Sequence, residues 1–335
     1  FCTSWITDHF KSAQKFLIFC GTGNNGGDGF AIARILYEKG FDVQVFMDRD
    51  QRKLSPDANV NFQKIKQISG IEINDFDKFS VIKNEQTVII DAIFGNGLSR
   101  KPSEKVELVI DKINQSKAPK IAVDVPTGLY ADRIADDNSL IVKADFTLTF
   151  QFYKRSFLHP ETGKFCGKIE LIDLGLDQDF INKTETKYFV IDESLIRTIY
   201  KPRQDFTNKG SFGKSILVGG SHGKMGAVLM SVLSALRSGS GLTVALSPEC
   251  GNLILQSQAP EAMFISSGEH HLENIEIQEK ATYGIGPGLG KEKVTQKALF
   301  DFLKNYSEPV VLDADALNMI ADNDKISLIP KHSVI

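Results

Sequence analysis

The first residues that could do chemistry stand in the glycine-rich run GTGNNGGDG, which begins at Gly21 and follows the apolar segment KFLIFC. Gly21, Gly23 and Gly26 fit the GxGxxG spacing of a dinucleotide-binding turn. Asp48 ends the next apolar segment, FDVQVFMD, where a ribose-binding acid is expected in such proteins. Taken alone, this spacing indicates an NAD-dependent oxidoreductase.

The same run also carries polar side chains where a dinucleotide turn usually keeps small ones: Asn24, Asn25 and Asp28. A carboxylate at a helix start opposes a phosphate and occupies the NH groups that would bind it. The loop therefore suits hydroxyl groups, an amide or a cation better than a pyrophosphate. The competing interpretation is that these residues only cap a helix, since Asn, Asp and Gly favour such positions.

Two further acids follow apolar segments, Asp91 in VIIDAIFGNG and Asp124 in IAVDVPTG. Each taken singly is equally well explained by a cap or a turn. Ligands of open α/β sheets, however, collect outside the carboxyl ends of the strands, so three such loops at one edge predict a site. The side-chain oxygens of Asn25, Asp91 and Thr127 form a hard-oxygen set with one carboxylate, which favours potassium or sodium over zinc or copper.

The second half carries glycine turns and acids of its own. SFGKS at 211–215 is similar to the end of a phosphate-binding P-loop, but Asn208 stands where that pattern needs glycine, and SILV has the pattern of a strand where a helix is needed. We therefore reject a P-loop. GGSHGKMGA, YGIGPGLG and PVVLDADALN each include a loop with glycine or acid beside an apolar segment. Glycine permits close approach of a ligand, with packing alone as the competing explanation.

Elements that could position these loops alternate along the chain. Apolar segments of strand length and amphipathic segments follow one another in the first part, which predicts βαβ units around a parallel sheet. Residues 143–175 have denser strand patterns and are expected to form a sheet edge. A polar segment with Pro and Gly lies at 199–211, after which the alternation restarts. We place one α/β domain at 1–199 and a second at 200–335.

Composition and charge exclude several classes of function. The chain has 39 Lys+Arg against 42 Asp+Glu, without a basic tail or stripe, so no nucleic-acid partner is expected. No apolar run approaches the ~20 residues of a membrane span, and the start lacks a signal-peptide pattern, so we expect a cytoplasmic protein without membrane association. The four cysteines lack CxxC spacing and are expected to be buried thiols. The histidines lack HxxxH and HExxH spacing, which favours solvated or capping roles.

Three motifs of the first half occur in the order found in the NAD(P)H-hydrate epimerase family. They are NNGGD at 24–28, Asp91-x-x-Phe-Gly-x-Gly, and Asp124-Val-Pro-Thr-Gly, within a similarity that spans roughly residues 15–175. The first domain therefore resembles a Rossmann-like, three-layer epimerase. The resemblance implies that it interconverts the R and S epimers of hydrated NADH or NADPH.

The resemblance to the epimerases also implies a set of site residues. Contacts to the hydrated nucleotide are expected from Asn24, Asn25, Gly26, Gly27, Asp28, Gly95, Asn96, Gly97, Leu98, Ser99, Arg100, Lys101 and Asp124. Potassium is expected at Asn25, Asp91 and Thr127. We assign Asp124 as the base, because a buried carboxylate can move a proton during ring opening and reclosure. Asp28 is the next candidate.

The second half resembles the ADP- or ATP-dependent NAD(P)H-hydrate dehydratase family, whose fold is ribokinase-like. The resemblance rests on PRQDFTNKGSFG, the glycine turn GGSHGKMGA, YGIGPGLG and PVVLDADALN, together with the fusion to an epimerase half. It implies that Ala227 and Gly288 face the hydrate and that Asp313 lies near the nucleotide phosphates. It also implies ADP or ATP with magnesium, used to dehydrate the S epimer back to NAD(P)H.

The two resemblances set expectations about the ends of the chain and its assembly. We expect a fragment truncated at both ends, with the epimerases' leading helical segment ahead of residue 1. The dehydratases' closing Gly-Thr-Gly-Asp loop, which carries the anion hole and base, is expected after residue 335. The chain as given is therefore expected not to dehydrate the hydrate. A homo-oligomer is also expected.

Two other functions remain open. The first is an NAD-dependent oxidoreductase that uses the GxGxxG run, although the acid-rich loop and the three matched motifs count against it. The second is a nucleotide-sensing scaffold that binds without turnover, as folds of this type can do. Activity on the two hydrate epimers would separate these functions.

Overall fold

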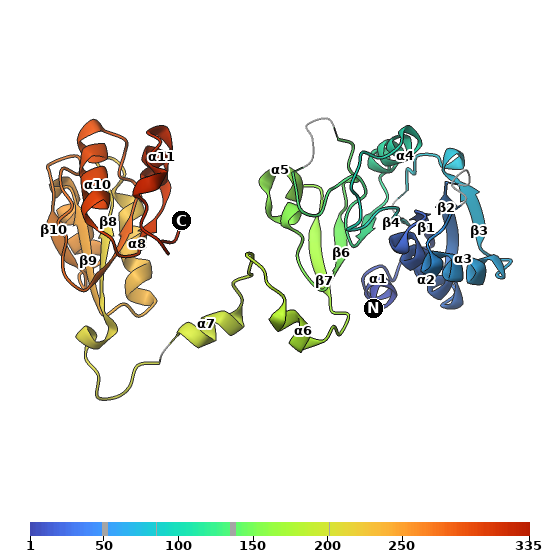
Figure 1. Cartoon of the computed structure of the whole chain (residues 1–335), viewed down its shortest axis with the longest axis horizontal. Helices are drawn as coiled ribbons and strands as arrows, with labels where there is room; N and C mark the ends of the chain where they lie inside the picture. The colour runs from blue at the N-terminus through green and yellow to red at the C-terminus, as the bar shows by residue number, and fades with distance from the viewer. Residues whose placement is uncertain (49–52, 85, 135–138, 201) are drawn as a thin grey trace. The chain divides into compact units, whose positions relative to one another are not determined.

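The chain divides into two compact units, Phe1–Phe189 and Val190–Ile335, which Figure 1 colours from blue to red in chain order. The computed structural model describes residues 1–48, 53–84, 86–134, 139–200 and 202–335. The predicted boundary near residue 200 falls after this division, in a segment whose helix α7 (Glu193–Ile199) buries no side chain.

A parallel sheet forms the centre of the first unit. Its strands are β1 (Lys15–Cys20), β2 (Asp42–Met47), β3 (Glu72–Asp75), β4 (Thr87–Ala92), β5 (Lys120–Val123), β6 (Phe146–Phe150) and β7 (Lys168–Ile172). Their order in the sheet is β3-β2-β1-β4-β5-β6-β7, with parallel pairing between neighbours. β7 is the edge predicted from residues 143–175. The order reverses between β1 and β4, which makes that place the switch point of a doubly wound sheet.

Helices cover both faces of this sheet. They are α1 (Cys2–His9), α2 (Asn24–Glu38), α3 (Pro56–Lys66) and α4 (Glu104–Gln115). The unit also contains α5 (Pro160–Gly163), the 3-10 turns η1 (Phe76–Lys78) and η2 (Arg155–Leu158), and α6 (Gln178–Lys183), which buries no side chain. Phe16 and Ile18 of β1 pack in one core with α1, α2 and α3, whereas Leu17 and Phe19 pack in another with α4. This alternation buries both faces of β1 and gives the predicted three layers.

One segment of turn-like composition in the first unit forms a helix. HPETG at 159–163 has the composition of a turn, but it forms the short helix α5, for which His159 is the N-cap. Pro160 occupies the first helical position, where its fixed φ is already helical and its missing NH costs nothing.

The second unit has its own parallel sheet. Its strands are β8 (Lys214–Val218), β9 (Leu242–Ser247), β10 (Met263–Ser266), β11 (Ala281–Ile285) and β12 (Val311–Leu312). Its helices after α7 are α8 (Met225–Arg237), α9 (Asn252–Gln258), α10 (Lys293–Asn305) and α11 (Ala314–Asp322), with η3 (Lys209–Phe212), η4 (Glu249–Gly251) and η5 (Ile326–Leu328). The order β10-β9-β8-β11-β12 reverses between β8 and β11. The predicted α/β class is therefore confirmed for both units.

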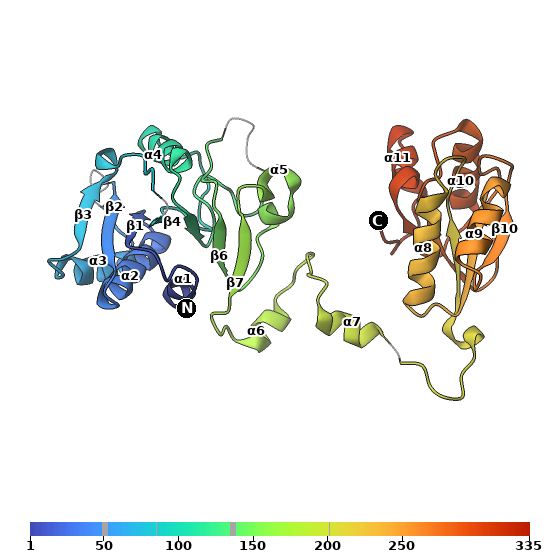
Figure 2. The ribbon, with the colours of Figure 1, turned by 180° about the vertical axis from the view of Figure 1, so that it is seen from behind.

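Two cores fill the faces of the second sheet. Val228 and Val232 of α8 pack with α9 on one face, whereas Phe302 of α10 and Met319 of α11 belong to the core on the other. Figures 1 and 2 show these two faces from opposite sides. β8 begins at Lys214, so the Lys-Ser of SFGKS starts a strand instead of a helix, and the rejection of a P-loop is confirmed. In the segment HSVI, Val334 forms a single parallel bridge with Val311.

Two global features complete the fold. Within the described residues, no helix is long and apolar enough to cross a membrane. The cysteines are unpaired: Cys2, Cys20 and Cys166 are buried and Cys250 is half-buried, which largely confirms the prediction of buried thiols.

Candidate functional site

The first unit's candidate site lies at the switch point, at the carboxyl ends of β1, β4 and β5. The loops after β1 and β4 touch, because a Cβ atom on Gly21 would lie 1.9 Å from the carbonyl oxygen of Ile93. Only glycine therefore fits at position 21. The contact brings the start of α2 beside the β4 loop, in the place where doubly wound sheets bind ligands.

Asp91 and Thr127 form a buried pair that joins β4 to the loop after β5. Both residues are fully buried. The Thr127 hydroxyl donates to one carboxylate oxygen of Asp91 at 2.6 Å, and the Thr127 backbone NH donates to the other at 2.8 Å. Burial raises the pKa of Asp91 to about 6, while hydrogen bonds from Thr127 and the Ile93 NH oppose that rise. The pair offers one carboxylate and one hydroxyl oxygen to a buried ligand.

Asn25, in the first turn of α2, carries an amide without a partner. Its Oδ1 and Nδ2 atoms are buried and make no hydrogen bond within the described part of the chain. A Cβ atom on Gly95 would lie 3.1 Å from Asn25 Oδ1 and 2.9 Å from Asp124 Oδ2, so both side chains point at this glycine. A buried amide without a partner costs stability, which indicates that a ligand satisfies it.

Asp124 follows β5 and is held from several directions. Its Oδ2 accepts the backbone NH of Asn96 at 2.9 Å. Its Oδ1 accepts the Thr149 hydroxyl at 3.3 Å and lies 3.0 Å from Lys154 Nζ. The residue is 7% exposed and has a φ of 65°, in the left-handed region that favours glycine. Strain of this kind persists only where surrounding contacts fix the residue, and it clusters at functional sites.

Asp28 is the second acid near Asp124. It is exposed, yet loss of solvation and then the negative charge of Asp124 raise its pKa to about 6. Neighbouring Asn24 accepts a hydrogen bond from the Ser55 hydroxyl at 2.6 Å, which joins it to the N-cap of α3. The two carboxylates therefore influence one another across the candidate site.

Other residues predicted to contact the substrate lie in two different environments. Gly26 and Gly27 are buried, and a Cβ on Gly27 would lie 2.9 Å from the Ala58 Cα, so close packing of α2 on α3 explains this glycine. The loop after β4 is open: the exposed residues are Asn96, Gly97, Ser99, Arg100 and Lys101, while Gly95 and Leu98 are half-buried. Lys101 Nζ lies 3.0 Å from the Glu107 carboxylate of α4. The predicted set thus forms a buried floor and an exposed rim.

Asp48, the acid that would bind ribose in an oxidoreductase, is engaged elsewhere. It is 8% exposed, and its Oδ1 accepts a hydrogen bond from Lys105 Nζ at 2.8 Å. The same ammonium lies 3.0 Å from the Asp75 carboxylate. A carboxylate committed to a lysine in this way is poorly placed to accept ribose hydroxyls.

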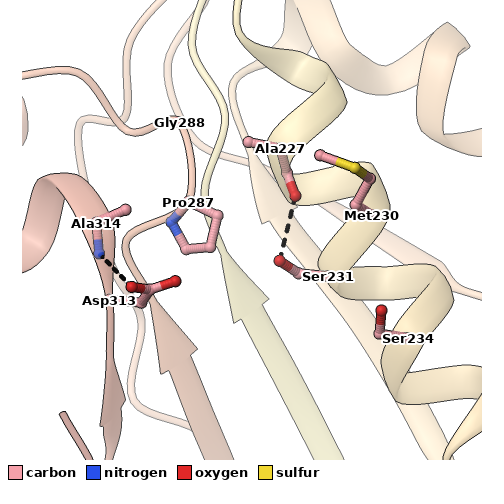
Figure 3. A pocket seen from close by; sticks show the side chains of 8 residues that line it. All are labelled: Ala227, Met230, Ser231, Ser234, Pro287, Gly288, Asp313 and Ala314. Carbon is pink, nitrogen blue, oxygen red and sulfur yellow. Dashed lines mark hydrogen bonds between the residues drawn. The ribbon is translucent and has the colours of Figure 1, made fainter. Parts of the chain in front are cut away.

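The second unit's candidate site is a cavity at the corresponding switch point. It has a volume of about 520 Å³ and is drawn in Figure 3. Its lining residues are Ala227, Met230, Ser231 and Ser234 of α8, Pro287 and Gly288 after β11, and Asp313 and Ala314 after β12. Three residues predicted from the sequence, Ala227, Gly288 and Asp313, therefore lie in one cavity. Figure 3 shows Pro287 between α8 and the Asp313 side.

Backbone geometry shapes this cavity. Gly288 has a φ of 68°, and a Cβ there would lie 2.6 Å from the carbonyl oxygen of Lys224, so the β11 loop approaches the start of α8 closely. Asp313 is the N-cap of α11, and its Oδ1 accepts the Ala314 NH at 2.7 Å. Asp315 accepts the Gly290 NH at 2.8 Å and lies 3.7 Å from Lys224 Nζ. These contacts fix the loops around the cavity, while the Asp313 side chain stays exposed.

Sequence reasoning missed Lys154 and Thr149. Both contact Asp124: Thr149 belongs to β6, and Lys154 follows that strand. The available signal was a lysine just after a strand pattern, in the run FTLTFQFYK, four positions beyond the end of β6.

The fold and the two candidate sites define a class of protein: two doubly wound α/β domains in one chain, each with polar loops at the switch point where such sheets bind ligands. Comparison with known families agrees with that division. Residues 1–156 match the model of the YjeF-related protein N-terminus, and residues 215–335 match the model of NAD(P)H-hydrate dehydratase.

Relatives with both regions are found in distant organisms. The bifunctional NAD(P)H-hydrate repair enzyme of Escherichia coli K12 is 32% identical over 319 residues, which cover 94% of this chain and 60% of that protein. The enzyme of the same name from Vibrio cholerae is 32% identical, with 97% and 65% covered. A structure of ADP/ATP-dependent NAD(P)H-hydrate dehydratase from Bacillus subtilis, co-crystallized with ATP/Mg²⁺, is 29% identical, covers 38% of this chain and 46% of that chain, and has a TM-score of 0.31.

The chain is therefore similar to bifunctional NAD(P)H-hydrate repair enzymes over 94% to 97% of its own length. It spans 60% to 65% of the length of the Escherichia coli and Vibrio cholerae relatives.

Proposed function

We propose that the first unit interconverts the R and S epimers of NAD(P)H-hydrate. The observation that carries this proposal is the meeting of Asn25 and Asp124 at Gly95, beside the buried Asp91–Thr127 pair. An unpartnered amide, a held carboxylate and a hard-oxygen pair at one switch point suit a polar ligand. The family match over residues 1–156 supports the same function.

Asp124 acts as the base in this proposal. Its carboxylate accepts the proton of the hydroxyl on the hydrated ring carbon. The oxygen forms a carbonyl as a ring bond at that carbon breaks, and the electron pair of that bond moves to the ring atom that leaves. Reclosure from the other face returns the electron pair and the proton, so that no atom is gained or lost. Positioned proton transfer of this kind contributes ~10²–10⁴-fold to a rate.

We propose potassium as the ion of this site, held by Asn25, Asp91 and Thr127. The unpartnered Asn25 amide oxygen supports it, because a buried oxygen of this kind needs a cation or a donor. The set contains one carboxylate and two neutral oxygens, which fits a hard cation of low charge. When bound, the ion supplies a positive charge that organises the three loops.

For the second unit we propose a part in ADP- or ATP-dependent dehydration of the S epimer, with magnesium. The cavity lined by Ala227, Gly288 and Asp313 supports this, as does the dehydratase match over residues 215–335. Ala227 and Gly288 would face the hydrate. Asp313, which is exposed at the cavity, would lie near the nucleotide phosphates.

Of the competing functions, an oxidoreductase is disfavoured because Lys105 donates a hydrogen bond to Asp48, the acid that would bind the ribose. A binding scaffold would share the same sites but would leave the epimer ratio unchanged. The test is therefore to add purified chain to the isolated R hydrate and to the isolated S hydrate of NADH, and to follow both epimers by chromatography. Convergence of both samples to one ratio, faster than in buffer, is expected. An unchanged rate would exclude the epimerase function.

A further inference from the structure

Lys154 is a nearly buried lysine that, among the described residues, forms an ion pair with one acid, Asp124. Its Nζ lies 3.0 Å from Asp124 Oδ1 and donates to the carbonyl oxygens of Phe150 at 3.0 Å and Phe152 at 3.2 Å. The side chains of Lys154 and Asp124 are 12% and 10% exposed. These three acceptors match the three donors of an ammonium group, so its orientation is fixed.

The chain bends after β6 in a way that makes this arrangement possible. Gln151 has a φ of 60°, in the left-handed region, and its NH donates to the Ile172 carbonyl of β7. The bend brings the carbonyl oxygens of Phe150 and Phe152, the residues on either side of Gln151, within hydrogen-bond distance of Lys154 Nζ. Left-handed backbone conformations occur on both sides of the ion pair, at Asp124 itself and at Gln151, three positions before Lys154.

The two oxygens of Asp124 therefore have different surroundings. Oδ1 faces Lys154 and the Thr149 hydroxyl. Oδ2 faces the loop after β4, where it accepts the Asn96 NH and lies beside Gly95. The substrate side of the site is the Oδ2 side, because the unpartnered Asn25 amide also points at Gly95.

We propose that Lys154 is a positioning residue for epimerisation, which fixes Asp124 Oδ1 so that Oδ2 is the oxygen that exchanges a proton with the substrate. The inference rests on the epimerase function proposed above. Lys154 exchanges no proton in this scheme, and its ammonium group holds Asp124 Oδ1 through the ion pair at 3.0 Å. It acts on the reaction through Asp124 rather than by touching the substrate.

A purely structural role is the competing explanation, in which Lys154 only ties the bend after β6 to the loop after β5. Replacing Lys154 by Gln separates the two. Glutamine keeps NH donors for the carbonyl oxygens but removes the charge that orients Asp124. If Lys154 has only a structural role, the Lys154→Gln variant should keep most of its kcat. If its charge orients Asp124, kcat should fall.

The experiment compares Lys154→Gln and Lys154→Met with the unaltered chain by steady-state epimerisation and thermal melting. We expect kcat to fall by ~10–100-fold in both variants, below the full contribution of a base, with KM changed by less than about 3-fold. Lys168→Met is the matched control, because Lys168 lies on the adjacent strand β7 and pairs with Glu170 at 2.7 Å. The control is expected to retain its kcat.

The outcomes are distinct. If the unaltered chain interconverts the epimers and Lys154→Gln keeps its kcat, the positioning role is wrong and the proposed function stands. The role is also wrong if KM rises while kcat is unchanged. If Lys154→Met melts early, the decision falls to Lys154→Gln, and a kcat loss there that merely tracks unfolding overturns the role. If the unaltered chain itself fails to change the epimer ratio, the proposed function falls, and this inference falls with it.

Discussion

In the first unit the acids that end β4 and β5 are buried and hydrogen-bonded, whereas in the second unit the acid that follows β12 lines an open cavity. Both sheets have the same order around their first strand, with β1 and β8 in equivalent places. Yet Asp91 is fully buried and Asp124 is 7% exposed, while Asp313 is exposed. The shared topology therefore sets where the loops gather, and the side chains set which ligand and which chemistry each site accepts.

The difference predicts that substitutions of the buried residues in the first site lower activity or stability more than substitutions in the second site do. A buried acid that loses a partner retains the cost of its desolvation. An exposed acid is solvated in either case. Four changes test this contrast.

Asp124→Asn is expected to have the largest effect. The change keeps the side-chain shape and removes the proton acceptor, so epimerisation should fall by ~10²–10⁴-fold. Circular dichroism should remain that of the unaltered chain. A variant with near-normal turnover would move the base elsewhere, with Asp28 as the next residue to test.

Thr127→Val should destabilise the first unit and weaken its response to potassium. The variant leaves one oxygen of the buried Asp91 without the hydroxyl that now lies 2.6 Å away, at a cost of about 1–3 kcal/mol in the free energy of unfolding. Chemical denaturation of the two chains measures the loss. Thr207→Val, at an exposed threonine of the second unit, serves as the control. Equal stability of both variants would contradict the claim that the Asp91–Thr127 hydrogen bond stabilises the first unit.

The pH dependence of stability provides a third comparison. The pKa of Asp91 is raised to about 6 in the folded chain from 3.8, so the folded state binds more protons than the unfolded state between these values. Its contribution is fully present below about pH 4 and is lost as pH rises through 6. The Asp91→Asn variant has no carboxyl group at this position, so in potassium-free buffer its stability should not show this decrease as pH rises. Melting temperatures of the two chains that change in parallel from pH 4 to 7 would contradict the assignment.

Asp313→Ala should have the smallest effect of the four. The change removes the N-cap of α11, whose carboxylate accepts the Ala314 NH, so the second unit should lose about 0.5–2 kcal/mol in the free energy of unfolding. Epimerase activity should be unchanged. A fall in epimerisation comparable to that of Asp124→Asn would show that the two sites do not act separately.

Strand runs such as KFLIFC and TVIIDA were predictable because central parallel strands are apolar on both faces, and acids at their ends mark the loops. Hence Asn25, Asp91 and Asp124 could be singled out from the sequence. The Thr127–Asp91 hydrogen bonds and the Lys154–Asp124 pair could not, because they depend on which strands become neighbours and on the left-handed turns at Asp124 and Gln151. Local sequence carries little information about either.

The most direct test of the central claim follows epimerisation of the pure S hydrate by the unaltered chain and by Asp124→Asn. Each chain is assayed in potassium and in tetramethylammonium at equal ionic strength. The account predicts rapid equilibration only for the unaltered chain in potassium, a slower rate for it in tetramethylammonium, and a rate near that of buffer for the variant. Equal rates for both chains, or no dependence on potassium, would contradict an Asp124 base beside a potassium site.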